Sequence, residues 1–127
     1  MNIKTLAFIA LGGGIGSVLR YSVGLLFVYL STPKFYPIAT FSVNVVGSFL
    51  IGLVSGFAEK PGVINPQLQL FLMAGVLGGF TTFSAFSLNT LAFFRREEFL
   101  FASLNILLTV AFCLVAVWAG FKTSSNL

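Results

Sequence analysis

Four long apolar runs divide this 127-residue chain, and short clusters of charged and turn-forming residues separate them. The runs cover residues 5–30, 37–58, 67–94 and 98–121. Each is at least as long as the roughly 20 residues that a helix needs to cross a bilayer core of about 30 Å. Only 8% of the residues are charged, whereas a soluble domain carries about 25%. We therefore expect an all-α membrane protein, in which residues 1–127 form a single four-helix transmembrane domain.

The third run contains a segment that favours an interrupted helix. Residues 78–87 read Gly-Gly-Phe-Thr-Thr-Phe-Ser-Ala-Phe-Ser, and this concentration of glycine, threonine and serine weakens a continuous helix. As one straight helix, the 28 residues of 67–94 would span about 42 Å, which is more than the bilayer core requires. Irregular backbone at membrane depth must be surrounded by protein or line a water-filled cavity. The sequence therefore predicts a broken third helix beside such a cavity.

Apart from Arg20, the Lys and Arg residues are divided equally between the two sides of a four-span chain. One side carries Lys4, Lys60 and Lys122, and the other carries Lys34, Arg95 and Arg96. Because an excess of Lys and Arg on one side normally sets orientation, either orientation should insert. Four spans are also too few to enclose an aqueous route and shield it from lipid. We therefore expect a dual-topology homodimer of antiparallel subunits, related by a two-fold axis in the membrane plane.

Small residues in the first two runs favour close contact between helices. The first run carries glycines at positions 12, 13, 14 and 16, and Gly52 and Gly56 form a small-xxx-small pair in the second. Two interpretations are open. These glycines could meet a partner subunit, or they could serve packing within one chain.

Uncharged polar residues recur at four-residue spacing in two of the runs. Thr40 and Asn44 share one face of the second helix, and Asn105 and Thr109 share one face of the fourth. Their side chains could form hydrogen bonds that hold helices together, or they could form a polar track that replaces water around a permeating ion. Arg20, within the first run, could anchor the helix end at the interface or attract anions into a vestibule.

Two phenylalanines in the third run stand out from the 16 in the chain because their neighbours are polar. Phe83 and Phe86 are three residues apart, on one helical face, with Ser84 between them. An aromatic ring has a positive edge, so such an edge could meet a small anion without a fixed cation that would hold the ion too tightly. Plain packing is the alternative.

The scarcity of histidine, cysteine and acidic residues excludes most classes of function. The chain has no histidine, and Cys113 is its only cysteine, so we expect no intrachain disulfide and no metal site of the usual kind. All three acidic residues, Glu59, Glu97 and Glu98, lie at the ends of the runs. We expect neither an enzyme nor a nucleic-acid partner. A proton-coupled exporter of the small multidrug-resistance type would need a carboxylate within the membrane, and a non-transporting membrane assembly subunit is a second alternative.

Three segments are similar to one known family. They are Gly-Gly-Gly-Ile-Gly-Ser-Val-Leu-Arg-Tyr at 12–21, Asn44 followed by Gly-Ser-Phe at 47–49, and the segment 78–87. Over nearly all of its length the chain resembles the Fluc-type fluoride channels, also called the CrcB family. The resemblance implies a fluoride-selective channel with two pores per antiparallel dimer. Such a channel would passively export cytoplasmic fluoride across the bacterial inner membrane.

The resemblance also implies roles for individual residues. Phe83 and Phe86 correspond to pore phenylalanines whose ring edges face fluoride, and Asn44 corresponds to a pore asparagine. The predicted fluoride pore comprises Phe83, Phe86, Asn44, Ser84, Thr40, Thr109, Asn105 and Arg20.

The family's polar track along the fourth helix falls on Phe101, Asn105 and Thr109, although Phe101 lacks the hydroxyl expected there. The family also implies a structural sodium ion at the dimer centre. Its ligands would be the backbone carbonyls of Gly78 and Thr81, with two copies of each in the dimer.

Overall fold

The computed structural model describes residues 2–30 and 36–127, and within these ranges every regular element is a helix. Four helical spans are long and apolar enough to cross a membrane: Ile3–Leu30, Pro37–Ala58, Pro66–Arg95 and Phe99–Asn126. The prediction of four membrane-spanning segments is therefore confirmed. Lys34 lies outside the described residues.

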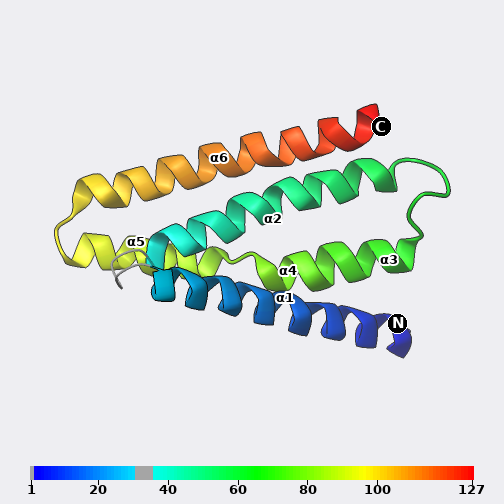
Figure 1. Ribbon diagram of the computed structural model, residues 1–127, viewed down its shortest axis with the longest axis horizontal. Coiled ribbons are helices and arrows are strands. Elements are labelled where there is room, and N and C mark those ends of the chain that lie inside the picture. Colours follow the sequence, from blue (N-terminus) through cyan, green and yellow to red (C-terminus); the bar gives the residue numbers. More distant parts are fainter. Residues whose placement is uncertain (1, 31–35) are drawn as a thin grey trace.

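The first, second and fourth spans are single helices, and the third is composite (Figure 1). The elements are α1 (Ile3–Leu30), α2 (Tyr36–Ala58), α3 (Pro66–Leu70), the π-helical segment η2 (Phe71–Leu77), α4 (Gly78–Phe80), α5 (Phe83–Arg95) and α6 (Phe99–Asn126). Asn65 begins the third span as a helix cap, because its side chain accepts a hydrogen bond from the Leu68 N–H at 2.8 Å.

The spans alternate in direction, so both termini and the connection between α2 and α3 lie at one end of the molecule (Figure 1). The connection between α5 and α6 lies at the other end. Lys4 lies in the first turn of α1, Lys60 follows α2 and Lys122 lies near the end of α6, so all three belong to the first of these ends. Arg95 and Arg96 lie where α5 ends, at the opposite end. Lys122 is an exposed residue of α6 rather than part of a tail, since the helix continues to Asn126.

Glycines allow α2 and α6 to pack closely along their length. A Cβ atom at Gly52 would lie against the Val117 carbonyl, and one at Gly120 would lie against the Phe49 carbonyl. A Cβ at Gly56 would meet the side chain of Ser124. The small-xxx-small pair of α2 therefore serves packing within the chain.

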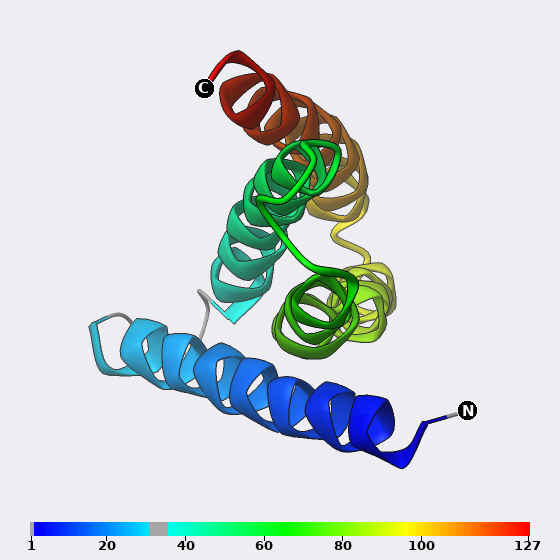
Figure 2. The same cartoon turned by 90° about the vertical axis from the view of Figure 1, so that its right-hand side faces the viewer.

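The first span packs against the third through a second set of glycines, on the side away from α6 (Figure 2). Added Cβ atoms at Gly12 and Gly16 would meet the backbone of η2, and one at Gly79 would meet the Gly13 carbonyl. A Cβ at Gly14 would meet nothing within 4 Å. Gly12, Gly16 and Gly79 thus have an intramolecular role, whereas Gly14 lies on an exposed face.

Most apolar side chains of the spans remain exposed in the single chain. In the most apolar stretch of each span, the buried share is 33% in the second span, 17% in the third and 11% in both the first and the fourth. In a membrane, these exposed apolar faces meet lipid tails or another protein surface.

Candidate functional site

The third span is interrupted at Thr81 and Thr82. Helix α4 ends at Phe80, and both threonines have extended backbone, with φ and ψ of −82° and 158° at Thr81 and −154° and 115° at Thr82. Thr82 then caps α5, since its hydroxyl accepts a hydrogen bond from the Ala85 N–H at 3.1 Å. Threonine is a favoured residue at this cap position, which explains why α5 begins where it does.

The interruption releases two carbonyl groups from the helical hydrogen-bond ladder. In a continuous helix the Thr82 N–H would bond the Gly78 carbonyl, and the Ala85 N–H would bond the Thr81 carbonyl. Instead, the Thr82 N–H donates to the Asn44 Oδ1 atom at 2.7 Å, and the Ala85 N–H donates to the Thr82 hydroxyl. The Gly78 and Thr81 carbonyls are therefore available to other partners.

Asn44 of α2 satisfies both backbone groups of Thr82. Its Oδ1 atom accepts from the Thr82 N–H at 2.7 Å, and its Nδ2 atom donates to the Thr82 carbonyl at 3.0 Å. Both residues are buried, with 8% and 9% of their surface exposed. A buried backbone group without a partner costs about 1–3 kcal/mol, so the Asn44 carboxamide stabilises the interruption by acting as a neighbouring peptide group would.

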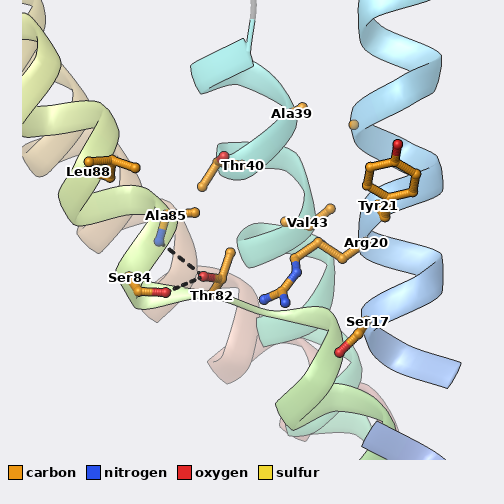
Figure 3. Close-up of a pocket in the computed structure, with 11 residues that line it drawn as sticks. Ser17, Arg20, Tyr21, Ala39, Thr40, Val43, Thr82, Ser84, Ala85 and Leu88 are labelled. Carbon is orange, nitrogen blue, oxygen red and sulfur yellow. Dashed lines mark hydrogen bonds between the residues drawn. The ribbon is translucent and has the colours of Figure 1, made fainter. Parts of the chain in front are cut away.

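Arg20 of α1 satisfies the released Thr81 carbonyl. The half-buried side chain extends from α1 towards the extended segment (Figure 3). Its Nη1 atom donates to the Thr81 oxygen at 3.1 Å. The guanidinium group therefore points into the helix bundle and not towards the interface at the end of α1.

Arg20 also lines a pocket of about 420 Å³ between α1, α2 and α5 (Figure 3). Thr40, Thr82 and Ser84 contribute hydroxyl groups to the same pocket. The Thr82 and Ser84 hydroxyls bond each other at 3.1 Å, and the Thr40 hydroxyl accepts from the Asn89 amide at 3.0 Å. We name this the Arg20 pocket; it combines one positive charge with several hydroxyls.

A second pocket of about 430 Å³ lies between α2, α5 and α6 and shares Thr82 with the first. Its lining comprises Asn44, Gly47, Ser48, Ile51, Thr81, Thr82, Phe83, Phe86, Thr109, Val110, Cys113 and Leu114. None of these residues carries a formal charge. The Phe83 and Phe86 ring centroids are 5.3 Å apart with an interplanar angle of 48°. Phe86 is buried, whereas Phe83 is 77% exposed. We name this the phenylalanine pocket.

Thr109 lines the phenylalanine pocket, and its hydroxyl stands out among the described polar groups. The side chain is buried, and its Oγ1 atom has no hydrogen-bond partner among residues 2–30 and 36–127. Helical Ser and Thr commonly bond the carbonyl four residues earlier, as Ser87 and Thr90 do here at 2.9 and 2.8 Å. Thr109 departs from this pattern, so its hydroxyl keeps its hydrogen-bonding capacity for a partner that reaches it.

The structure divides the predicted pore residues among three places. Asn44, Phe83, Phe86 and Thr109 line the phenylalanine pocket, and Arg20, Thr40 and Ser84 line the Arg20 pocket. Asn105 is absent from both linings; its Nδ2 atom donates to the Thr90 hydroxyl at 2.9 Å. Phe101, which the family resemblance placed on the same track, is 57% exposed and stacks on Phe93 with centroids 5.9 Å apart.

Three residues of this region are missing from the predicted site. Thr82 borders both pockets, Asn89 bonds Thr40, and Thr90 links Asn105 to the Phe86 carbonyl. Two signals could have found them. Thr82 directly precedes a helix start and so favours a cap, and Asn89 and Thr90 follow Phe86 at helical spacing, on its face.

Comparison with known proteins places the chain in a family. A family model described as CrcB-like protein, Camphor Resistance (CrcB), matches residues 7–121. A curated protein of Elusimicrobium minutum is 46% identical over 122 residues, which cover 96% of this chain and 94% of the relative. Relatives from Flavobacterium psychrophilum and Geobacter sulfurreducens are 44% and 43% identical, each covering 98% of this chain and 100% of the relative. All three are named fluoride-specific ion channel FluC. Since these matches span nearly the whole sequence, the chain belongs to the CrcB family.

Proposed function

We propose that the chain is a fluoride-selective ion channel that passively exports cytoplasmic fluoride down its electrochemical gradient. The observation that carries the proposal is the uncharged phenylalanine pocket, where the buried Thr109 hydroxyl has no partner among the described residues. The name that the three relatives carry supports fluoride as the permeating ion.

The lining of this pocket suits a small, strongly hydrated anion. Such an ion needs hydrogen-bond donors and positive dipoles in place of the water that it leaves. The Thr109 hydroxyl supplies a donor, and the edges of Phe83 and Phe86 supply the positive part of a ring quadrupole. Conduction also requires that the ion leave, and a lining without a fixed charge supports rapid exit.

The proposed assembly is an antiparallel, dual-topology homodimer with two pores. Phe83 is 77% exposed, although it borders the pocket that we assign to the ion. A pore wall open to lipid would let the ion meet hydrocarbon, so a second copy has to cover this face. The balance of Lys and Arg between the two ends of the chain supports an antiparallel partner, because neither orientation is favoured on insertion.

We also propose that the third helix is broken in the assembled channel. The break would hold a structural sodium ion at the dimer centre. Backbone carbonyls are hard ligands that suit such a cation, and those of Gly78 and Thr81 have both left the helical ladder. Gly78 is exposed and so accessible to a partner subunit. The Thr81 oxygen accepts from Arg20 and would offer its second lone pair.

Passive conduction is sufficient for fluoride export from a bacterial cytoplasm. Neutral HF crosses bilayers and dissociates in the more alkaline interior, where the anion is trapped. A channel in the cytoplasmic membrane lets the potential drive fluoride out, with about 2.3 kcal/mol per 100 mV for a single charge. No intramembrane carboxylate for proton coupling is needed, and the acidic residues Glu59, Glu97 and Glu98 all lie outside the membrane-spanning helices.

Ion efflux from liposomes tests the proposal. Reconstituted protein should release fluoride and largely retain chloride when a potassium ionophore sets the potential, and an imposed proton gradient should not be required. Comparable efflux of the two halides would contradict selectivity. Transport that requires the proton gradient would instead indicate a coupled exporter, and the absence of any flux would indicate a non-transporting subunit.

A further inference from the structure

Helices α5 and α6 form a hairpin, and one hydrogen bond between side chains ties its two arms together. The Asn105 Nδ2 atom of α6 donates to the Thr90 Oγ1 atom of α5 at 2.9 Å. Within residues 2–30 and 36–127, this is the only side-chain hydrogen bond between α6 and another helix. Nearer the turn of the hairpin, Phe93 and Phe101 stack with ring centroids 5.9 Å apart. Beyond that stack, the Thr90–Asn105 bond therefore holds α5 and α6 at a fixed separation.

The bond lies one helical turn from the phenylalanine pocket on both arms. Thr90 follows Phe86 by four residues on α5, so these two residues share a helix face. Asn105 precedes Thr109 by four residues on α6 and shares a face with it in the same way. Because the two arms run in opposite directions, the bonded pair lies next to the pair formed by Phe86 and Thr109. Phe86 and Thr109 line the pocket, whereas Thr90 and Asn105 do not, so the bond acts on the pocket from outside.

The Thr90 hydroxyl also holds the backbone of Phe86. It donates its single proton to the Phe86 carbonyl at 2.8 Å, and its oxygen accepts the bond from Asn105. Threonine in a helix divides between two rotamers, since its hydroxyl can bond either of two preceding carbonyls. The Asn105 amide favours the rotamer that bonds Phe86. The buried Phe86 ring is thereby fixed relative to α6, beside the Phe83 ring at a centroid distance of 5.3 Å.

We propose that Thr90 is a positioning residue of the channel: its bond to Asn105 sets the width of the phenylalanine pocket and thereby the preference for fluoride over chloride. Pore diameter contributes to ion selectivity, and chloride is the larger halide. A wider gap between Phe86 and α6 should therefore admit it more readily. The proposal rests on the function proposed above, since it assigns the phenylalanine pocket to the permeating ion.

Fluoride and chloride efflux from matched proteoliposomes test the inference, and the readout is the chloride-to-fluoride efflux ratio. Thr90→Val keeps the shape of the side chain but removes both hydrogen bonds. It should raise the ratio about tenfold, which corresponds to about 1.4 kcal/mol between the two barriers. Asn105→Leu breaks the same interhelical bond from α6 and should raise the ratio similarly, so it carries the test if Thr90→Val does not fold. Because both variants break one bond, the double variant should raise the ratio no further than either change alone.

Two variants provide the controls. Thr90→Ser retains the hydroxyl and both of its bonds, so it should keep the wild-type ratio. Thr123→Val removes an intrahelical bond of the same kind, to the Ala119 carbonyl at 2.8 Å, without an interhelical partner. It should leave the ratio unchanged. A purely structural defect would lower the efflux of both halides in proportion, and the ratio would not move.

Three results would overturn the inference: an unchanged ratio in both Thr90→Val and Asn105→Leu, an equal rise in Thr90→Ser, or additive rises in the double variant. Failure of the proposed function is distinguishable, because the wild-type chain would then show no fluoride efflux or no preference for fluoride. In that case the role in selectivity falls with it. SDS unfolding of the two single variants and the double variant still reports whether the bond couples α5 to α6.

Discussion

Replacement of Asn44 by Leu should destabilise the fold far more than loss of one ordinary hydrogen bond. The change keeps a side chain of similar size but removes both partners of the buried Thr82 backbone. Each orphaned group costs about 1–3 kcal/mol, so the two together predict a loss of about 2–6 kcal/mol. We expect the lower half of this range, because interhelical hydrogen bonds in membranes average only about 0.6 kcal/mol in double-mutant cycles.

Asn105→Leu is the matched control for Asn44→Leu. Asn105 is a half-buried amide that donates one hydrogen bond, to the Thr90 hydroxyl at 2.9 Å. Thr90 retains its own bond to the Phe86 carbonyl after the change. No buried backbone group is orphaned, so the expected cost is only about 0.5–1.5 kcal/mol.

Unfolding of purified protein in mixed micelles with increasing SDS measures the difference, followed by the fluorescence of Trp118, the only tryptophan. Asn44→Leu should unfold at clearly lower SDS than Asn105→Leu, and its fluoride efflux should be lost. If the two variants have equal stability, Asn44 does not hold the interruption of the third span, and the reasoning from its two hydrogen bonds is refuted.

Three further predictions concern permeation and topology. Thr109→Val should lower fluoride efflux by about tenfold to a hundredfold, since hydrogen bonds to charged groups contribute about 1.5–3 kcal/mol. Thr123→Val, which loses only an exposed bond to the Ala119 carbonyl, should leave efflux unchanged. Equal effects of the two changes would contradict a role for the Thr109 hydroxyl. Phe83→Ile and Phe86→Ile keep apolar bulk without a ring edge, so efflux should fall while crosslinking still detects a dimer; full efflux in both would assign the rings to packing. Two or three lysines added beside Lys60 should force one orientation on a C-terminal reporter and lower efflux, with rescue by an oppositely biased partner; a wild-type reporter on one side only would rule out dual topology.

The membrane spans were predictable because apolar length is a local property of the sequence. The end of α6 was not: the apolar run stops at 121, whereas the helix continues to Asn126. The last turns are held by contacts that hydropathy does not report. Thr123 bonds the Ala119 carbonyl at 2.8 Å, and Ser124 is fully buried against Gly56 of α2.

Sequence spacing singled out polar residues of the candidate site but gave no indication of their hydrogen-bond partners. Thr40 and Asn44 share a helical face, yet they line different pockets, Thr40 that of Arg20 and Asn44 that of the two phenylalanines. Asn44 bonds a residue 38 positions away, and Arg20 bonds one 61 positions away. Such pairings depend on how the helices pack, and a single sequence carries no direct signal for them.

Arg20 and Asn44, which stabilise the interruption, line different pockets, and only the Arg20 pocket carries a charge. Arg20 borders only the pocket on the α1 side, where its charge lies against the Thr81 carbonyl, and the phenylalanine pocket contains no charged residue. Thr82 borders both pockets, and Asn44 holds it in place through its backbone. In the proposed channel, the guanidinium would attract an anion on the α1 side, and the uncharged lining on the α6 side would not trap it. Attraction and release are thus assigned to opposite sides of one extended segment, which a continuous third helix could not provide.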